Sequence, residues 1–164
     1  MASPISLPIA GGCNCQKVRY QIEATPLIVH CCHCSWCQRE TGTAFALNAV
    51  IESSNVTHLG AEPEIILTPS ASGRGQGIAR CPTCHIAVYS NYDGLDDLIY
   101  TRVGTLDTPN MFPPDIHIFA ASKQPWVVLG DGVPVVEEFY NRKDVWAPDK
   151  LERLSDVLRK AGRM

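Results

Sequence analysis

Short apolar runs, many of them alternating with polar residues, recur along most of the chain. Residues 18–24 read Val-Arg-Tyr-Gln-Ile-Glu-Ala, which is the period-two pattern of a strand with one buried face. Further apolar runs, separated by Gly, Pro and other turn residues, predict more strands. They lie at residues 26–30, 45–51, 56–59, 64–68, 75–80, 86–90, 98–104 and 116–120. This many short strands favours a mainly β fold.

The C-terminal part of the chain has a helical period instead. Five apolar residues fall on one face of a predicted helix: Leu151, Leu154, Val157, Leu158 and Ala161. Asp149, with Glu152 three residues later, predicts a capping box at the start of this helix, and Gly162 predicts its end. Residues 131–148, which contain two prolines, are predicted to be a surface loop and a candidate pocket lid.

Composition and charge limit the class of protein. With 164 residues, 45% of them hydrophobic and 19% charged, the chain is expected to form a single domain over residues 1–164. A formal net charge of −3 and the lack of a Lys/Arg block disfavour binding to nucleic acid. No apolar run is long enough for a membrane span, and residues 1–5 do not resemble a signal peptide. A cytoplasmic location is therefore expected.

All eight cysteines lie within three residues of another cysteine. Cys13 and Cys15 follow two glycines in a predicted turn, and Cys81 and Cys84 lie between two predicted strands, as in a zinc-ribbon hairpin. The other four lie in residues 31–37, where a helical turn from Ser35 to Glu40 is expected to end at Gly42. Such close spacing is typical of metal ligands, with zinc favoured over iron, and not of a disulfide framework.

The spacing divides the cysteines into two ligand sets. Two distant pairs make one closed four-thiolate zinc site, the structural site: Cys13, Cys15, Cys81 and Cys84. A second zinc is expected on three thiolates with an open fourth position, the catalytic site: Cys32, Cys34 and Cys37. Adjacent residues of an extended segment point to opposite faces, so Cys31 is interpreted as a buried apolar residue. His33 as a closing fourth ligand remains the alternative.

Other polar residues near these cysteines are candidates for substrate chemistry. A proton acceptor is sought among His33, Glu40 and His117, although each is more often a packing or surface residue. Arg39 is the candidate for holding a substrate carboxylate, with a surface salt bridge as the alternative. Trp36 is interpreted as a core residue, with a pocket wall as the alternative. Asp107 is interpreted as a turn residue.

Together these motifs resemble the glutathione-dependent formaldehyde-activating enzyme family, which shares its domain with centromere protein V. The resemblance spans residues 9–130. It is carried by Gly11-Gly12-Cys13-x-Cys15, Val18-Arg19-Tyr20, the run from Cys32 to Phe45, Cys81-x-x-Cys84, Val103 to Asp107, Pro113-x-x-x-His117 and Trp126. There are two departures: the family usually has Gly where this chain has His85, and it usually lacks a cysteine at the position of Cys31.

The resemblance implies an Mss4-like fold of short antiparallel sheets, with a core over residues 9–130 and a C-terminal loop and helix over 131–164. It implies two zinc ions on the ligand sets given above. The implied activity is that of a carbon–sulfur lyase joining glutathione and formaldehyde into S-(hydroxymethyl)glutathione, so that the expected partner is a small thiol such as glutathione. A non-catalytic, zinc-stabilised interaction or chaperone-like module is the alternative. A homodimer is left open.

Overall fold

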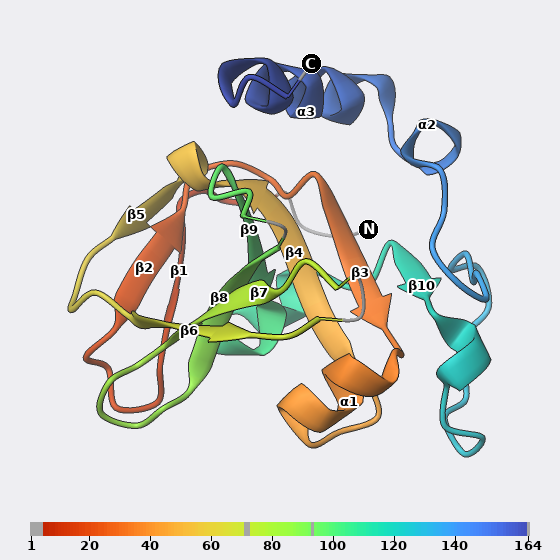
Figure 1. The fold of residues 1–164 in the computed structure, drawn as a ribbon, viewed down its shortest axis with the longest axis horizontal. Helices are drawn as coiled ribbons and strands as arrows, with labels where there is room; N and C mark the ends of the chain where they lie inside the picture. The colour runs from red at the N-terminus through yellow and green to blue at the C-terminus, as the bar shows by residue number, and fades with distance from the viewer. Residues whose placement is uncertain (1–4, 71–72, 93, 164) are drawn as a thin grey trace.

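Two β-sheets form the body of the computed structural model, which describes residues 5–70, 73–92 and 94–163 (Figure 1). The smaller sheet has three antiparallel strands in the order β1-β2-β5. Its strands are β1 (Ile9–Gly12), β2 (Arg19–Ile22) and β5 (Val56–His58). The larger sheet has seven strands in the order β10-β3-β4-β9-β8-β7-β6. These are β3 (Ile28–Cys32), β4 (Ala46–Glu52), β6 (Glu64–Thr68), β7 (Gln76–Arg80), β8 (Ala87–Tyr92), β9 (Leu98–Arg102) and β10 (Ile116–Ile118).

The expected mainly β fold is confirmed, with one difference in pairing. β10 lies parallel to β3, so the larger sheet is mixed rather than wholly antiparallel. The helices are α1 (Ser35–Thr41), α2 (Arg142–Val145) and α3 (Pro148–Lys160). Four 3-10 segments accompany them: η1 (Ser53–Asn55), η2 (Val103–Thr105), η3 (Pro109–Met111) and η4 (Ala120–Ser122). No helix in the described part of the chain has the length and apolar character that a membrane span requires.

The buried side chains form two clusters. The first lies between the two sheets and includes Tyr20, Ile51 and Val88. The second packs β3 and β4 against the C-terminal helix, and it includes Leu154 and Val157 of α3. Cys32 and Cys37 belong to this second cluster, so that part of the predicted catalytic site is built into the core.

The two glycines before Cys13 lie in β1, and the predicted turn begins only at Cys13. Their role is close packing. A Cβ on Gly11 would lie 2.8 Å from the Tyr20 ring, and one on Gly12 would lie 2.3 Å from the carbonyl oxygen of Val18. Neither contact is possible for a side chain, and both strands would have to move apart.

The C-terminal helix confirms the predicted apolar face but not the predicted cap. Its N-cap is Ala147, and Pro148 occupies the first helical position, where its missing N–H costs nothing. The capping-box prediction was therefore wrong, and Asp149 lies in the first turn, where a carboxylate favours the helix dipole. Gly162 follows the helix with a φ of 66°, as expected for a helix end.

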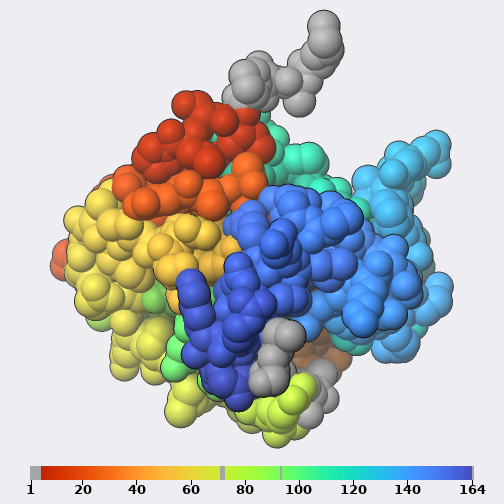
Figure 2. All heavy atoms as spheres, turned by 90° about the horizontal axis from the view of Figure 1, so that it is seen from above, coloured from red at the N-terminus to blue at the C-terminus, as the bar shows by residue number. Residues whose placement is uncertain are grey.

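The predicted surface loop at 131–148 contains ordered structure. Residues 134–138 run beside β10: the His117 N–H donates to the Pro134 carbonyl at 2.8 Å, and the Phe119 N–H donates to that of Glu138 at 2.9 Å. The chain then passes through α2 into α3. In the space-filling view these C-terminal residues, in blue, cover a broad part of the face that is seen from above (Figure 2).

Candidate functional site

The structure brings together the four cysteines of the predicted structural site. Cys13 and Cys15 lie in the turn after β1, and Cys81 and Cys84 in the turn between β7 and β8. All four Sγ atoms lie within 4.8 Å of one another. The Sγ atom of Cys15 is 3.5 Å from that of Cys13 and 3.6 Å from that of Cys81. A tetrahedral zinc with bonds of 2.3 Å separates its sulfurs by about 3.8 Å, so the donor set fits zinc.

Backbone N–H groups point at the sulfurs of this four-cysteine cluster. The Val18 N–H donates to Cys13 Sγ and the Thr83 N–H donates to Cys81 Sγ, each at 3.4 Å. Hydrogen bonds from the Cys84 and Thr83 backbone lower the pKa of Cys81 to about 6. These donors stabilise a thiolate, which is the form that binds a metal.

Each of the two turns carrying these cysteines ends in a left-handed residue that is not glycine. Gln16 follows Cys15 with a φ of 65°, and His85 follows Cys84 with a φ of 60°. The His85 N–H donates to the Cys81 carbonyl at 2.9 Å, which closes the turn. The departure from glycine at His85 therefore leaves the turn in place, at the cost of an unfavourable backbone conformation.

The three predicted catalytic cysteines also converge, where β3 meets α1. Cys32 ends β3, Cys34 is the N-cap of α1, and Cys37 lies in the first turns of that helix. Their Sγ atoms lie within 4.8 Å of one another, and Cys34 Sγ accepts the Cys37 N–H at 3.4 Å. Hydrogen bonds from Cys32 and Cys37 lower the pKa of Cys34 to about 2. These hydrogen bonds favour the thiolate form of Cys34, which is the form that binds a metal.

A cavity of about 380 Å³ lies beside these three sulfurs. Aromatic side chains and arginines line much of the rest of it, including Trp36, Phe139 and Arg142. Trp36 is 38% exposed, so its interpretation as a core residue was wrong and it walls the cavity instead. Phe139 and Arg142 come from the segment that was predicted to be a lid.

Arg102 places a buried positive charge at the cavity wall. Its side chain is only 8% exposed and donates to Asn48 Oδ1 at 2.8 Å and to Ser90 Oγ at 3.3 Å. No carboxylate pairs with it among the residues that the structure describes. A buried guanidinium is costly without a counter-charge, which the cysteine thiolates of the same cavity or an anionic occupant can supply.

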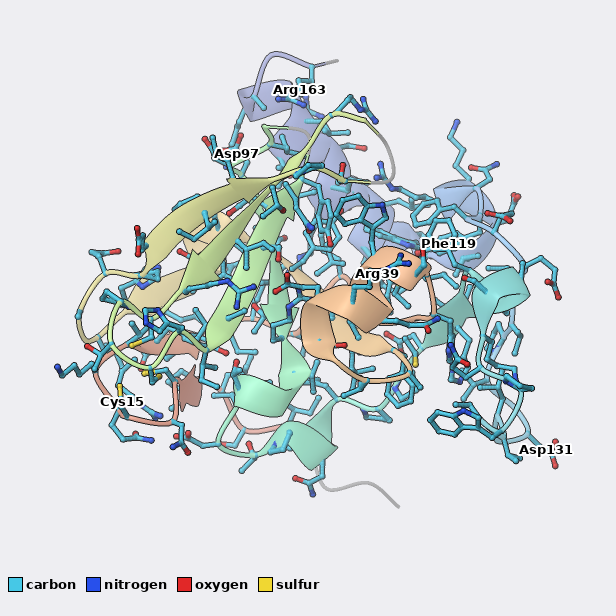
Figure 3. The ribbon with its side chains drawn as sticks, turned by 60° about the horizontal axis from the view of Figure 1, so that its bottom comes forward. Cys15, Arg39, Asp97, Phe119, Asp131 and Arg163 are labelled. Atoms are coloured by element: carbon cyan, nitrogen blue, oxygen red, sulfur yellow. The ribbon has the colours of Figure 1, made fainter. Side chains whose placement is uncertain are left out.

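The candidate for carboxylate binding, Arg39, lies elsewhere. It is exposed on α1, where Figure 3 labels it. It is not among the residues that line the cavity. Asp107 does not line the cavity either. It forms an ion pair with Arg19 at 2.5 Å. The cationic groups that face the cavity are Arg102 and Arg142, together with Arg74.

Of the three candidate proton acceptors, only Glu40 lines the cavity, and it forms an ion pair with Arg80. His33 and His117 do not line it. His30, which was not predicted, does. Its Nε2 atom lies 2.6 Å from the Tyr140 hydroxyl, which accepts the Trp146 indole N–H at 2.7 Å. Burial, with the nearby charge of Arg142, lowers the pKa of His30 to about 4, so this imidazole is neutral.

The position of His30 at the cavity could have been predicted from the alternation of side chains along the strand. Residues i and i+2 of a strand share a face, so His30 and Cys32 point to the same side of β3. The sequence interpretation placed His30 at the end of a strand and did not extend the alternation backwards from the cysteines.

Known proteins share sequence or structure with this chain. A sequence model of the family described as glutathione-dependent formaldehyde-activating enzyme matches residues 8–122. A search of curated proteins gives no match. Among solved structures the chain is similar to a Rhodobacter sphaeroides protein from a structural genomics programme. The two are 20% identical with a TM-score of 0.48, over 60% of this chain and 88% of that one.

Proposed function

Because the chain belongs to the glutathione-dependent formaldehyde-activating enzyme family, we propose that it is a zinc-dependent carbon–sulfur lyase. Its substrates would be adducts of small thiols and aldehydes, as in S-(hydroxymethyl)glutathione synthase. One observation carries the proposal: three cysteine sulfurs converge at the wall of a cavity, and no fourth ligand atom completes the group. Within the described residues no other His, Cys, Asp or Glu ligand lies within 4.8 Å of all three.

The proposed enzyme would bind two zinc ions. Cys13, Cys15, Cys81 and Cys84 would hold a structural ion, and the three cysteines at the cavity would hold a catalytic one. Bound there, zinc supplies Lewis acidity and lowers the pKa of a thiol that reaches its open position. The alternative of a non-catalytic module requires a closed second site, which this donor set does not provide.

The residues of the cavity wall would bind and orient the thiol. Arg102 and Arg142 suit the carboxylates of a small peptide thiol, because a guanidinium binds a carboxylate through paired N–H donors. Trp36 and Phe139 cover the apolar part of such a ligand and exclude water from it.

The reaction itself needs one proton to move. The S–H bond of the thiol breaks, a C–S bond forms to the aldehyde carbon, and the proton ends on the aldehyde oxygen, with no oxidant involved. His30 lies at the cavity wall as a neutral imidazole held by Tyr140, and this pair is our proposed carrier of the proton. The reverse sequence releases aldehyde and thiol.

Exchange NMR with ¹³C-formaldehyde and glutathione tests the proposal. The zinc-loaded protein is expected to accelerate exchange between free formaldehyde and its thiol adduct above the uncatalysed rate, and Cys34→Ser is expected to abolish the acceleration. Other thiols bearing carboxylates form the second arm, because the family name does not fix the substrate of this chain. Exchange at the uncatalysed rate for every thiol and aldehyde pair would refute the lyase proposal.

A further inference from the structure

The second face of β3 carries a ligand set of its own. Because side chains alternate along an extended segment, Cys31 and His33 point away from Cys32 and Cys34. Strand β10 lies against β3 in parallel register, with His117 opposite Cys31. The thiol and imidazole of Cys31 and His33 thus meet the imidazole of His117, 84 residues beyond His33, on the side of β3 away from the cavity.

All three side chains are buried. Cys31 is 2% exposed, His33 is 0% exposed and His117 is 7% exposed. Their ligand atoms lie within 4.8 Å of one another. The His33 Nε2 atom lies 3.6 Å from Cys31 Sγ and 3.0 Å from His117 Nδ1. A tetrahedral zinc separates a sulfur from a nitrogen ligand by about 3.5 Å, and two nitrogen ligands by about 3.3 Å, so these spacings are close to those of a metal site.

The three ligand atoms face one another: His33 Nε2 lies within hydrogen-bond distance of both Cys31 Sγ and His117 Nδ1. The Nδ1 atom of His33 is buried and has no partner among the described residues, and a metal on Nε2 would leave it so. The case for a metal therefore rests on three ligand atoms that are buried together at ligand spacing. On one side the His33 ring contacts Phe45, whose centroid lies 5.6 Å away and which is 39% exposed. The cluster therefore lies one side chain below the surface, within reach of an ion.

We propose that Cys31, His33 and His117 form a third metal site, with one thiolate, two imidazoles and an external fourth ligand. The thiolate and the imidazoles select a borderline or soft divalent cation such as Zn²⁺ or Co²⁺, and they exclude Mg²⁺ and Ca²⁺, which require oxygen ligands. The ion would join β10 to β3 and carry a net charge of +1 with its ligands. The site stands independently of the proposed lyase activity, because none of its residues lines the cavity.

Metal stoichiometry of the untagged full-length protein tests the site. After loading with Zn²⁺ and gel filtration, elemental analysis is expected to give three zinc ions per chain. Cys31→Ala and His117→Asn are each expected to give two. His58→Asn, a histidine that neighbours Tyr89 and belongs to no cysteine cluster, is the matched control and should keep three.

Cobalt substitution identifies which site a variant has lost. A site with one sulfur contributes little to the sulfur-to-cobalt charge-transfer absorbance, so Cys31→Ala should remove one cobalt equivalent and only a minor part of that absorbance. A zinc content that Cys31→Ala and His117→Asn both leave at the wild-type value, whatever that value is, would overturn the site and leave a hydrogen-bonded histidine pair. Circular dichroism checks that each variant is folded. If His117→Asn fails to fold, Cys31→Ala, the smaller change, decides the question.

Discussion

At the scale of single residues, the proposed function makes Arg102 the group on which substrate selection most depends. We expect Arg102→Met to raise KM for thiols that carry a carboxylate by about 10- to 100-fold, since a hydrogen bond to a charged group contributes about 1.5–3 kcal/mol. Thiols without a carboxylate should lose much less. Arg39→Met is the matched control, because that arginine is exposed and does not line the cavity. Equal losses for both thiol classes would mean that Arg102 supports the cavity rather than the substrate.

His85 offers a test of backbone strain. Its φ of 60° is unfavourable for any residue with a Cβ, while its side chain is exposed. We expect His85→Gly to raise the free energy of unfolding by about 0.5–1 kcal/mol, after the entropy cost of glycine is subtracted. His85→Ala separates the effects, because it keeps the strain and removes only the imidazole. Chemical denaturation of the zinc-loaded proteins measures both, and a His85→Gly protein no more stable than His85→Ala would contradict the strain argument.

At the scale of elements, α3 is attached to the sheet by an ion pair between the buried Glu52 carboxylate and the half-buried Arg153. Arg153 donates to both carboxylate oxygens of Glu52, at 2.6 and 2.5 Å. Burial alone would raise the pKa of Glu52, but hydrogen bonds from Arg153 and Asn55 outweigh burial and lower it. The contribution of this carboxylate to stability is therefore complete above its unfolded-state pKa of about 4.3, and it is lost as the pH falls through the lower folded-state value.

The ion pair gives a pH-dependent difference between two proteins. At pH 7 we expect Arg153→Met to lower the free energy of unfolding by about 3 kcal/mol, because it leaves Glu52 charged and buried. The difference should shrink as the pH falls, first as the unpaired Glu52 of the variant is protonated, since burial raises its pKa, and until the wild-type Glu52 is protonated as well. Urea unfolding of both proteins at each pH measures this difference. Protonation of the cysteine thiolates at low pH destabilises both proteins alike, so it cancels in the difference. Adding Glu52→Gln to Arg153→Met should recover much of the loss at pH 7, and a loss that is independent of pH would contradict the role of charge.

Individual strands and helices also show which parts of the site could be predicted from the sequence. Alternation along β3 correctly separated Cys31 from Cys32, because adjacent strand residues face opposite sides whatever the tertiary structure. The meeting of Cys31 with His117 was not predictable in the same way, since it depends on a parallel pairing of β3 with β10. Local spacing likewise placed the three cavity cysteines together, whereas Arg102 and Arg142 reach the cavity only through the packing of distant elements. The start of α3 was misplaced because the capping-box interpretation put the N-cap at Asp149, whereas Pro148 occupies the first helical position.

At the scale of the whole molecule, the four-cysteine cluster joins the two sheets. Cys13 and Cys15 follow β1 of the smaller sheet, and Cys81 and Cys84 connect β7 and β8 of the larger one. Of the four, Cys13 and Cys81 are buried, Cys84 is half-buried and Cys15 is exposed, whereas at the cavity Cys32 and Cys37 are buried and Cys34 is half-buried. A metal on the four cysteines would stabilise the fold because it joins the two sheets, as structural zinc sites do by about 10 kcal/mol in small domains, and a metal on the three cavity cysteines would lack a fourth protein ligand.

Chelation should therefore separate the two sites in time. We expect a chelator to remove zinc from the three cavity cysteines first, with loss of exchange activity and an unchanged circular dichroism spectrum. Zinc on the four cysteines should leave later, together with the β-sheet signal. Zinc added after the first phase should restore activity, because Cys32, Cys34 and Cys37 stay positioned by β3 and α1. Release in a single phase, with activity and fold lost together, would mean that the cavity metal holds the fold as much as the other one does. In that case the open fourth position would no longer argue for catalysis.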